Sequence, residues 1–144
     1  MSERKTFCTF RLEGHWFGIE VESVQEVLRH QPVTALGWAN ESVRGLLNLR
    51  GQVVAAVDLR RGLGMAPRPS EQLASNVVVR IGGAAVSLWV DEVGDVAEVD
   101  TAAFERTPST LAGVSQYLIR GVYKLEDHLL HALDLPRVIN AVMT

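Results

Sequence analysis

The chain has 144 residues, the usual size of one compact domain, and its 47% apolar and 22% charged residues are the balance of a globular protein rather than a disordered one. Its formal net charge of −3 provides no basic surface for a phosphate backbone, so nucleic acid is not an expected partner. No apolar run approaches the roughly 20 residues that cross a bilayer, so we expect no membrane insertion.

The amino-terminal region predicts mainly β structure. Alternating apolar side chains favour strands over residues 7–12 and 16–21, with Gly14 at the turn between them. Residues 24–28 place apolar side chains at helical spacing, which predicts a turn or two of helix. Asn40 follows in a loop and is a residue type that caps a short helical turn.

The middle of the chain predicts a hairpin followed by a connector. Residues 45–49 and 52–59 have the pattern of two strands that turn at Arg50 and Gly51. Residues 61–75 contain a cluster of Gly, Pro and Ser, which predicts a short helix that runs into an exposed connector.

The second half predicts two further hairpins and a terminal helix. Residues 76–81 and 84–90 flank a Gly-Gly pair that suits a tight two-residue turn. Residues 117–125 and 128–133 form the next candidate hairpin. Residues 136–142 predict a helix with a proline in its first turn, where the missing amide hydrogen costs nothing.

The two halves of the chain share one plan. A shift of 76 residues (121 − 45 = 76) aligns Gly45 with Gly121, and a shift of 69 residues (88 − 19 = 69) aligns Ile19 with Leu88. The other aligned pairs are Arg44 with Arg120, Leu49 with Leu125, Ala56 with Ala132, Asp58 with Asp134, Leu59 with Leu135, Val21 with Val90, Val24 with Val93 and Val27 with Val96. We therefore expect two small β subdomains that share a hydrophobic seam, because each alone would bury only a marginal core.

The polar residues show no pattern of a catalytic or metal site. His128 and His131 are three residues apart, and this odd spacing sends them to opposite faces of a strand. Asp91, Glu92 and Asp95 match no calcium loop, and we interpret them as a solvated acidic turn. We expect no enzymatic activity, no cofactor and no metal.

The aromatic residues leave one alternative open. Trp16 and Trp89 lie in predicted strands, where packing explains them, whereas Trp38 lies in a loop and could contact a ligand. A small-ligand-binding β-barrel that uses Trp38 and Trp89 is therefore a minor alternative function.

The compartment follows from the cysteine count and the amino terminus. Cys8 is the only cysteine, so an intrachain disulfide is excluded and a buried thiol is expected. The first six residues lack the apolar core of a signal peptide, so we expect a cytoplasmic protein.

The places where the two copies differ point to function, because the fold needs only what recurs. Arg50 and Gly51 in the first copy are replaced by Glu126 and Asp127 in the second. Arg50 is a planar cation with five donors beside a glycine that lets another backbone approach. A turn with a solvated arginine is the competing interpretation. Glu26 has a weaker claim, because the second copy also has an acid, at Asp95.

The sequence resembles the CheW-type chemotaxis coupling proteins from about Thr6 to Val142. The resemblance is carried by residues 17–27, 43–60 and 90–96, and by the closing Leu133-Asp134-Leu135. Its most specific part is the hairpin Asn48-Leu49-Arg50-Gly51.

The resemblance implies a mainly β fold with two small five-stranded, Src-homology-3-like barrels around a common core, short helical turns and a C-terminal helix. It implies one CheW-like domain over residues 1–144, with subdomain halves at roughly 14–66 and 76–134 and the terminal segments packed across them.

The resemblance also implies a function. The chain would be a non-catalytic adaptor that couples the cytoplasmic tip of chemoreceptors to the regulatory domain of the histidine kinase CheA in arrays at the membrane. A pilus-motility or developmental pathway is the alternative. The receptor-binding residues implied are Glu26, Asn48, Arg50, Gly51 and Val96, and the kinase-binding residues implied are Val24, Val33 and Gly45.

Overall fold

The computed structural model describes residues 3–35, 42–69, 71–106 and 116–143. The strands are β1 (Arg4–Leu12), β2 (His15–Glu20), β3 (Val24–Leu28), β4 (Val43–Leu49), β5 (Gln52–Asp58), β6 (Ser75–Ile81), β7 (Ala84–Val90), β8 (Glu92–Asp100), β9 (Phe104–Glu105), β10 (Ile119–Lys124) and β11 (Leu129–Leu133). The α-helices are α1 (Leu59–Gly62) and α2 (Leu135–Met143), and the 3₁₀-helices are η1 (Val21–Ser23), η2 (Thr101–Ala103) and η3 (Gln116–Leu118).

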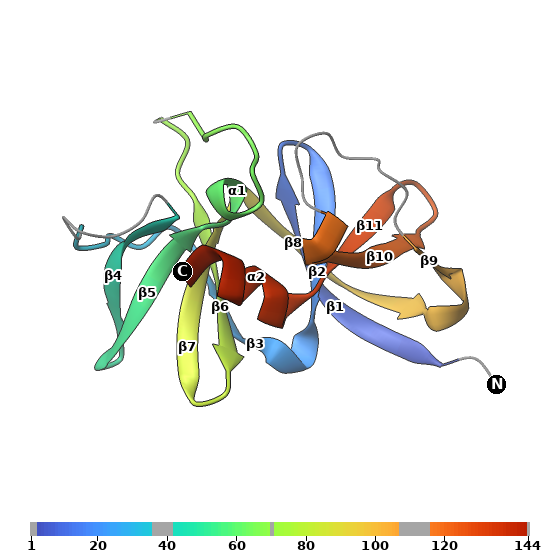
Figure 1. Cartoon of the computed structure of the whole chain (residues 1–144), viewed down its shortest axis with the longest axis horizontal. Helices are drawn as coiled ribbons and strands as arrows, with labels where there is room; N and C mark the ends of the chain where they lie inside the picture. Colours follow the sequence, from blue (N-terminus) through green and yellow to red (C-terminus); the bar gives the residue numbers. More distant parts are fainter. Residues whose placement is uncertain (1–2, 36–41, 70, 107–115, 144) are drawn as a thin grey trace.

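The strands form two sheets, which lie side by side in Figure 1 with α2 across their junction. Sheet A has six strands in the order β8-β1-β2-β11-β10-β9, and sheet B has five in the order β3-β6-β7-β5-β4. The predicted mainly β architecture with two sheets and a C-terminal helix is confirmed. Sheet A has one strand more than expected because the two-residue β9 adds to its edge.

Each half of the chain gives one hairpin to the other half's sheet. The first-half hairpin β1–β2 pairs with β8 and, in parallel, with β11. The second-half hairpin β6–β7 pairs with β3 and, in parallel, with β5. The sheets therefore do not coincide with the expected halves 14–66 and 76–134. Alternation and turns specify a hairpin locally, whereas the strand that pairs with its free edge is set by tertiary packing.

The aligned glycines Gly45 and Gly121 occupy equivalent places in the two sheets. Each follows a register shift, in the β4–β5 and β10–β11 pairs respectively. A Cβ at Gly45 would collide with the backbone of Thr34, and one at Gly121 with the backbone of Glu105. The repeat seen in the sequence is thus a structural one, and these glycines allow a second segment to approach the strand closely.

Each sheet curves so that one segment of chain reaches both of its edges. In sheet A, β8 at one edge continues through η2 to β9 at the other. In sheet B, β3 lies at one edge, and Thr34 a few residues later bridges to Leu46 in β4 at the other. Two small, nearly closed β units result.

The two sheets share one core. It includes Phe10 and Phe17 from sheet A, Val57 and Leu88 from sheet B, and Val138 from α2. The expected hydrophobic seam is confirmed. Cys8 is also buried in this core, as expected, and burial raises the pKa of its thiol.

Several local expectations were wrong. Residues 24–28 form strand β3, paired with β6, rather than a helix, because their β-branched valines suit an edge strand. Helix α1 begins at Leu59, before residue 61, because the side chain of Asp58 accepts a hydrogen bond from the Arg60 amide. The following connector is not wholly exposed, since the side chain of Arg68 is only 6% exposed. Asn40 and Trp38 lie outside the described residues.

Candidate functional site

The β4–β5 hairpin has a tight two-residue turn. Arg50 has a φ of 51° and Gly51 a φ of 86°, both in the left-handed region that a type I′ turn requires. The side-chain oxygen of Asn48 accepts a hydrogen bond from the Gly51 amide at 2.9 Å. Asn48 therefore stabilises the turn that presents Arg50.

Arg50 is held through one terminal nitrogen of its guanidinium, and the rest of its side chain is open to solvent. Its Nη1 donates to a carboxylate oxygen of Glu26 in β3 at 3.0 Å. The Arg50 side chain is 81% exposed, whereas that of Glu26 is only 16% exposed. An exposed ion pair of this kind contributes at most about 1 kcal/mol to stability, so its main effect is to orient the guanidinium.

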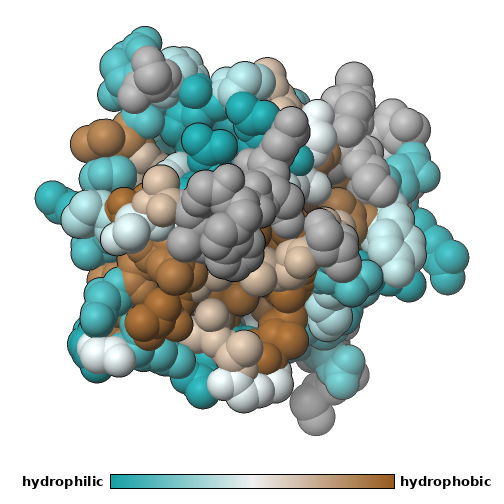
Figure 2. Space-filling model, turned by 60° about the vertical axis from the view of Figure 1, so that its left-hand side comes forward, coloured by the Kyte–Doolittle hydropathy of each residue, from teal (hydrophilic) through white to brown (hydrophobic). Residues whose placement is uncertain are grey.

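The surface beside the turn is partly apolar. Val53 lies opposite Asn48 in the β4–β5 pair and is 64% exposed. Figure 2 brings the β4–β5 side forward and shows apolar side chains gathered beside polar ones on this face. Exposed apolar surface rimmed by charge is typical of a reversible protein–protein contact.

The structure brings together four of the five residues expected to bind a receptor. Glu26, Asn48, Arg50 and Gly51 meet at one end of sheet B through the two contacts above. Val96 is 62% exposed but lies in β8, in the other sheet. A partner that touches all five residues must therefore contact both sheets.

The three residues expected to bind the kinase belong to one sheet unit. Val24 is half-buried in β3, and Val33 packs against the small core inside sheet B. Gly45 is buried, and its lack of a side chain lets Thr34 pair with Leu46 through hydrogen bonds of 2.8 and 2.9 Å. Gly45 can thus affect a partner only through the placement of Thr34.

Sequence reasoning missed a buried ion cluster around Asp91. The carboxylate of Asp91 accepts hydrogen bonds from Arg60 Nε at 2.8 Å, from Arg68 Nε at 3.0 Å and from the Glu13 amide at 2.9 Å. Burial alone would raise the pKa of Asp91, but these hydrogen bonds outweigh it and hold the pKa below its ordinary value. Its hydrogen bond to Asp91 in turn raises the pKa of Arg60.

The interpretation as a solvated acidic turn was therefore wrong for Asp91, which is buried, and right for Glu92 and Asp95 only in their exposure, because both lie in strand β8. The Asp91 side chain is 9% exposed, whereas Glu92 and Asp95 are exposed to solvent. The partners Arg60 and Arg68 lie 31 and 23 positions away in the sequence. No local pattern marks such a pairing, so only the folded chain could reveal it.

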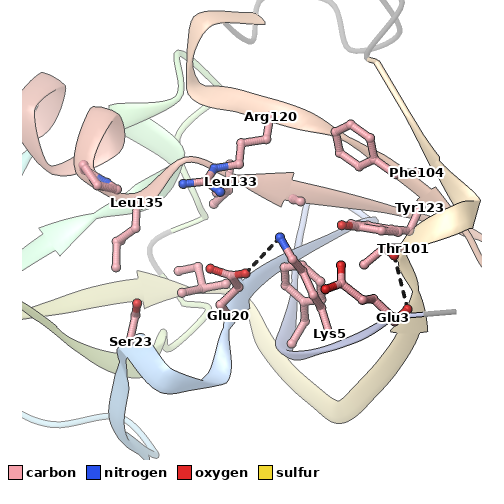
Figure 3. A pocket seen from close by; sticks show the side chains of 14 residues that line it. Glu3, Lys5, Glu20, Ser23, Thr101, Phe104, Arg120, Tyr123, Leu133 and Leu135 are labelled. Carbon is pink, nitrogen blue, oxygen red and sulfur yellow. Dashed lines mark hydrogen bonds and ion pairs between the residues drawn. The ribbon is translucent and has the colours of Figure 1, made fainter. Parts of the chain in front are cut away.

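Two cavities offer space for a small molecule. The larger, about 420 Å³, lies in sheet A beside the start of α2, with Phe104, Tyr123 and Leu133 in its lining (Figure 3). Lys5 and Glu20 pair across it at 3.3 Å. The smaller, about 300 Å³, is lined in part by Trp89, one of the two tryptophans named for the alternative ligand site. Several of the charged groups that line them are paired within the chain, Lys5 with Glu20 in the larger and Arg68 with Asp58 in the smaller.

His131 and His128 make structural contacts with Trp16. His131 is buried and its Nδ1 donates to the Trp16 carbonyl oxygen at 2.8 Å, whereas His128 is 31% exposed beside the Trp16 ring. Burial lowers the pKa of His131. Among the described residues, no three His, Cys, Asp or Glu side chains are placed to hold a metal ion.

Comparison with known proteins decides the family. The family profile described as CheW-like domain matches residues 6–143. The chain belongs to the CheW-like domain family. This membership confirms the resemblance carried by the Asn48 to Gly51 hairpin and places the chain among the scaffold and adaptor proteins of chemotaxis.

Individual relatives agree with the family. A probable chemotaxis protein CheW of Rhizobium etli is 27% identical over 131 residues, which is 91% of this chain and 84% of that protein. Protein PilI of Pseudomonas aeruginosa is 30% identical over 118 residues, which is 82% of this chain and 66% of that protein. The crystal structure of the scaffolding protein TtCheW from Thermoanaerobacter tengcongensis matches with a TM-score of 0.81 and 25% identity, over 92% of this chain and 86% of that one.

The helices of this CheW-family chain are short. Across the part of the chain that the structure describes, none is long and apolar enough to span a bilayer.

Proposed function

We propose that this CheW-family chain is a non-catalytic adaptor of a bacterial chemosensory pathway, which couples the cytoplasmic tip of a chemoreceptor to a CheA-type histidine kinase. The single observation that carries the proposal is the β4–β5 turn, which presents Arg50 on a chain whose family comprises chemotaxis scaffolds. The protein would act in the cytoplasm and be recruited to receptor arrays at the membrane.

The receptor-binding surface consists of Glu26, Asn48, Arg50, Gly51 and Val96. Arg50 offers donors that the single Nη1 bond to Glu26 leaves unused, and these suit carboxylate or carbonyl acceptors on a receptor helix. Exposed Val53 beside the turn supplies apolar area next to this cation. Such a mixed surface supports a modest, reversible interface.

The kinase-binding surface lies on sheet B near Val24, Val33 and Gly45. These residues are half-buried or buried, so they would shape the surface more than they contribute contact area. The main-chain pairing of Thr34 with Leu46, which Gly45 permits, is the feature that fixes this edge.

Co-sedimentation tests the proposal. The purified chain is mixed with membranes that carry chemoreceptors and with CheA, and the pelleted fractions of chain and kinase are measured. We expect both to pellet together with the receptor. Arg50→Glu should abolish receptor-dependent pelleting, whereas the matched control Lys124→Glu should retain it, because Lys124 is an exposed, paired cation in sheet A.

The outcome is decisive in either direction. If Arg50→Glu remains folded and still pellets with receptor as the parent does, the turn is not the receptor site.

The relative PilI supports a second candidate, an adaptor of a pilus-motility pathway. Pelleting with the receptor and kinase of a pilus system, but not with those of a flagellar system, would favour that candidate. Native mass spectrometry that finds a retained small molecule would instead favour a ligand-binding protein.

A further inference from the structure

The described chain passes between the two sheets at two junctions. It leaves sheet A for sheet B between β2 and β3, through η1, and returns from β7 to β8 at Asp91. These junctions and the shared core are what determine how one sheet is oriented on the other.

The Asp91 junction is fixed by directional bonds to both sheets. On the sheet A side, the Asp91 amide donates to the Arg11 carbonyl oxygen at 3.1 Å, and its carboxylate accepts from the Glu13 amide in the β1–β2 turn. On the sheet B side, it binds Arg60 of α1, which directly follows β5, and Arg68 of the connector. Helix α1 packs against β7, β5 and α2, near the junction of the sheets (Figure 1).

The Asp91 cluster, defined as Asp91, Arg60, Arg68, Glu13 and Asp58, is largely enclosed. The Arg60 and Arg68 side chains are 8% and 6% exposed, and Asp58 lies 3.7 Å from Arg68 Nη1. Buried ionic groups tolerate only the geometry that pairs them, because an unpaired buried charge is costly.

The other junction has a different character. Helix η1 has no side-chain cap hydrogen bond and contains no buried residue, and Glu22 within it is exposed. Apolar contact in the shared core is not directional, so it holds the sheets together without specifying one angle between them. Of the two described junctions, the one at Asp91 has the side-chain hydrogen bonds that define the angle between the sheets.

We propose that Asp91 is a positioning residue, which sets the orientation of sheet A on sheet B and thereby aligns Val96 with the Arg50 turn. The inference rests on the proposed function, because only a receptor site that includes both sheets depends on their relative orientation. The kinase-binding residues all belong to the sheet B unit, so binding of the kinase does not require that alignment.

Spin labels test the orientation without any partner. Labels are attached at Val53→Cys in β5 and Leu129→Cys in β11, which are exposed and occupy equivalent strands of the two sheets. The parent without these substitutions should take no label, because Cys8 is buried. Pulsed dipolar spectroscopy then compares the distance distribution in Asp91→Asn with that in the matched junction variant Glu22→Gln.

We expect Asp91→Asn to shift or broaden the distribution and Glu22→Gln to leave it unchanged. If Asp91→Asn fails to fold, Arg68→Gln replaces it, since this variant removes one cation of the cluster and leaves the Arg60–Asp91 pair. A distribution identical to that of the parent in the folded cluster variant overturns the proposal.

Binding separates positioning from a general loss of stability. We expect the cluster variant to bind receptor about tenfold more weakly and to bind CheA within about twofold of the parent, in the range of ordinary coupling between sites. Equal losses for both partners would mean a merely structural role and would overturn the inference. If the parent itself binds no receptor, the proposed function fails, while the spin-label result still decides whether Asp91 sets the orientation.

Discussion

The close approach at Gly45 predicts a measurable cost for a single methyl group. An alanine Cβ at this position would overlap the carbonyl of Thr34, so the segment that contains Thr34 must move away from β4. That movement lengthens the two main-chain hydrogen bonds between Thr34 and Leu46. Each such bond contributes about 1 kcal/mol, so Gly45→Ala should lower the free energy of unfolding by about 2 kcal/mol. The corresponding fall in Tm is about 6 °C.

Urea unfolding followed by circular dichroism measures this change, and Gly121→Ala is the matched variant. A Cβ at Gly121 would overlap Glu105 and the Phe104 ring, so a comparable loss of stability is expected. Kinase binding should weaken only in Gly45→Ala, because Gly121 lies in sheet A. A free energy of unfolding unchanged within about 0.5 kcal/mol in Gly45→Ala would refute the steric argument. Equal weakening of kinase binding by both variants would refute the specific role of Gly45.

Two further changes have defined outcomes. Gly51 has a φ of 86°, so Gly51→Ala should lower the free energy of unfolding by about 1 kcal/mol. Gly51→Asn should recover part of this loss, because asparagine tolerates the left-handed region better than alanine. If urea unfolding gives the same stability for the parent and both variants, the turn assignment is wrong. His131 has a pKa below its ordinary value in the folded state, so the unfolded chain binds more protons at mildly acidic pH and stability falls as the pH drops below about 6.5. His131→Phe should remove this component of the pH dependence. If the free energy of unfolding of this variant, measured from pH 7.5 to 5, falls in parallel with that of the parent, His131 is not the source of the pH dependence.

The sequence by itself determined the β4–β5 and β6–β7 hairpins. Arg50-Gly51 and Gly82-Gly83 specify tight turns between alternating strands, and the predicted hairpins there are confirmed. Alternation and turn chemistry act over a few neighbouring residues, so they can be read without knowledge of the rest of the chain. Arg50 was also found from the sequence alone, because the second copy has no arginine at the equivalent position.

The repeat also emerged from the sequence, and the structure supplied the physical reason for it. Gly45 and Gly121 align because each sheet needs one residue without a side chain at the point where a second segment approaches the strand closely. Residues 24–28 show the limit of such reasoning. Their spacing suited a helix, but pairing with β6 stabilises the extended form, and this pairing depends on a strand some 50 residues away.

Only the tertiary structure decided how the halves combine. The exchange of the β1–β2 and β6–β7 hairpins depends on which strand edges meet after collapse, which no short segment encodes. The Asp91 cluster has the same origin, because Arg60 and Arg68 reach Asp91 only once α1 and the connector have packed against the β7–β8 junction. The tight hairpin turns are set by local conformational preference, whereas the extended form of β3, the sheet partners and the buried ion cluster are set by pairing and burial, which involve the whole chain at once.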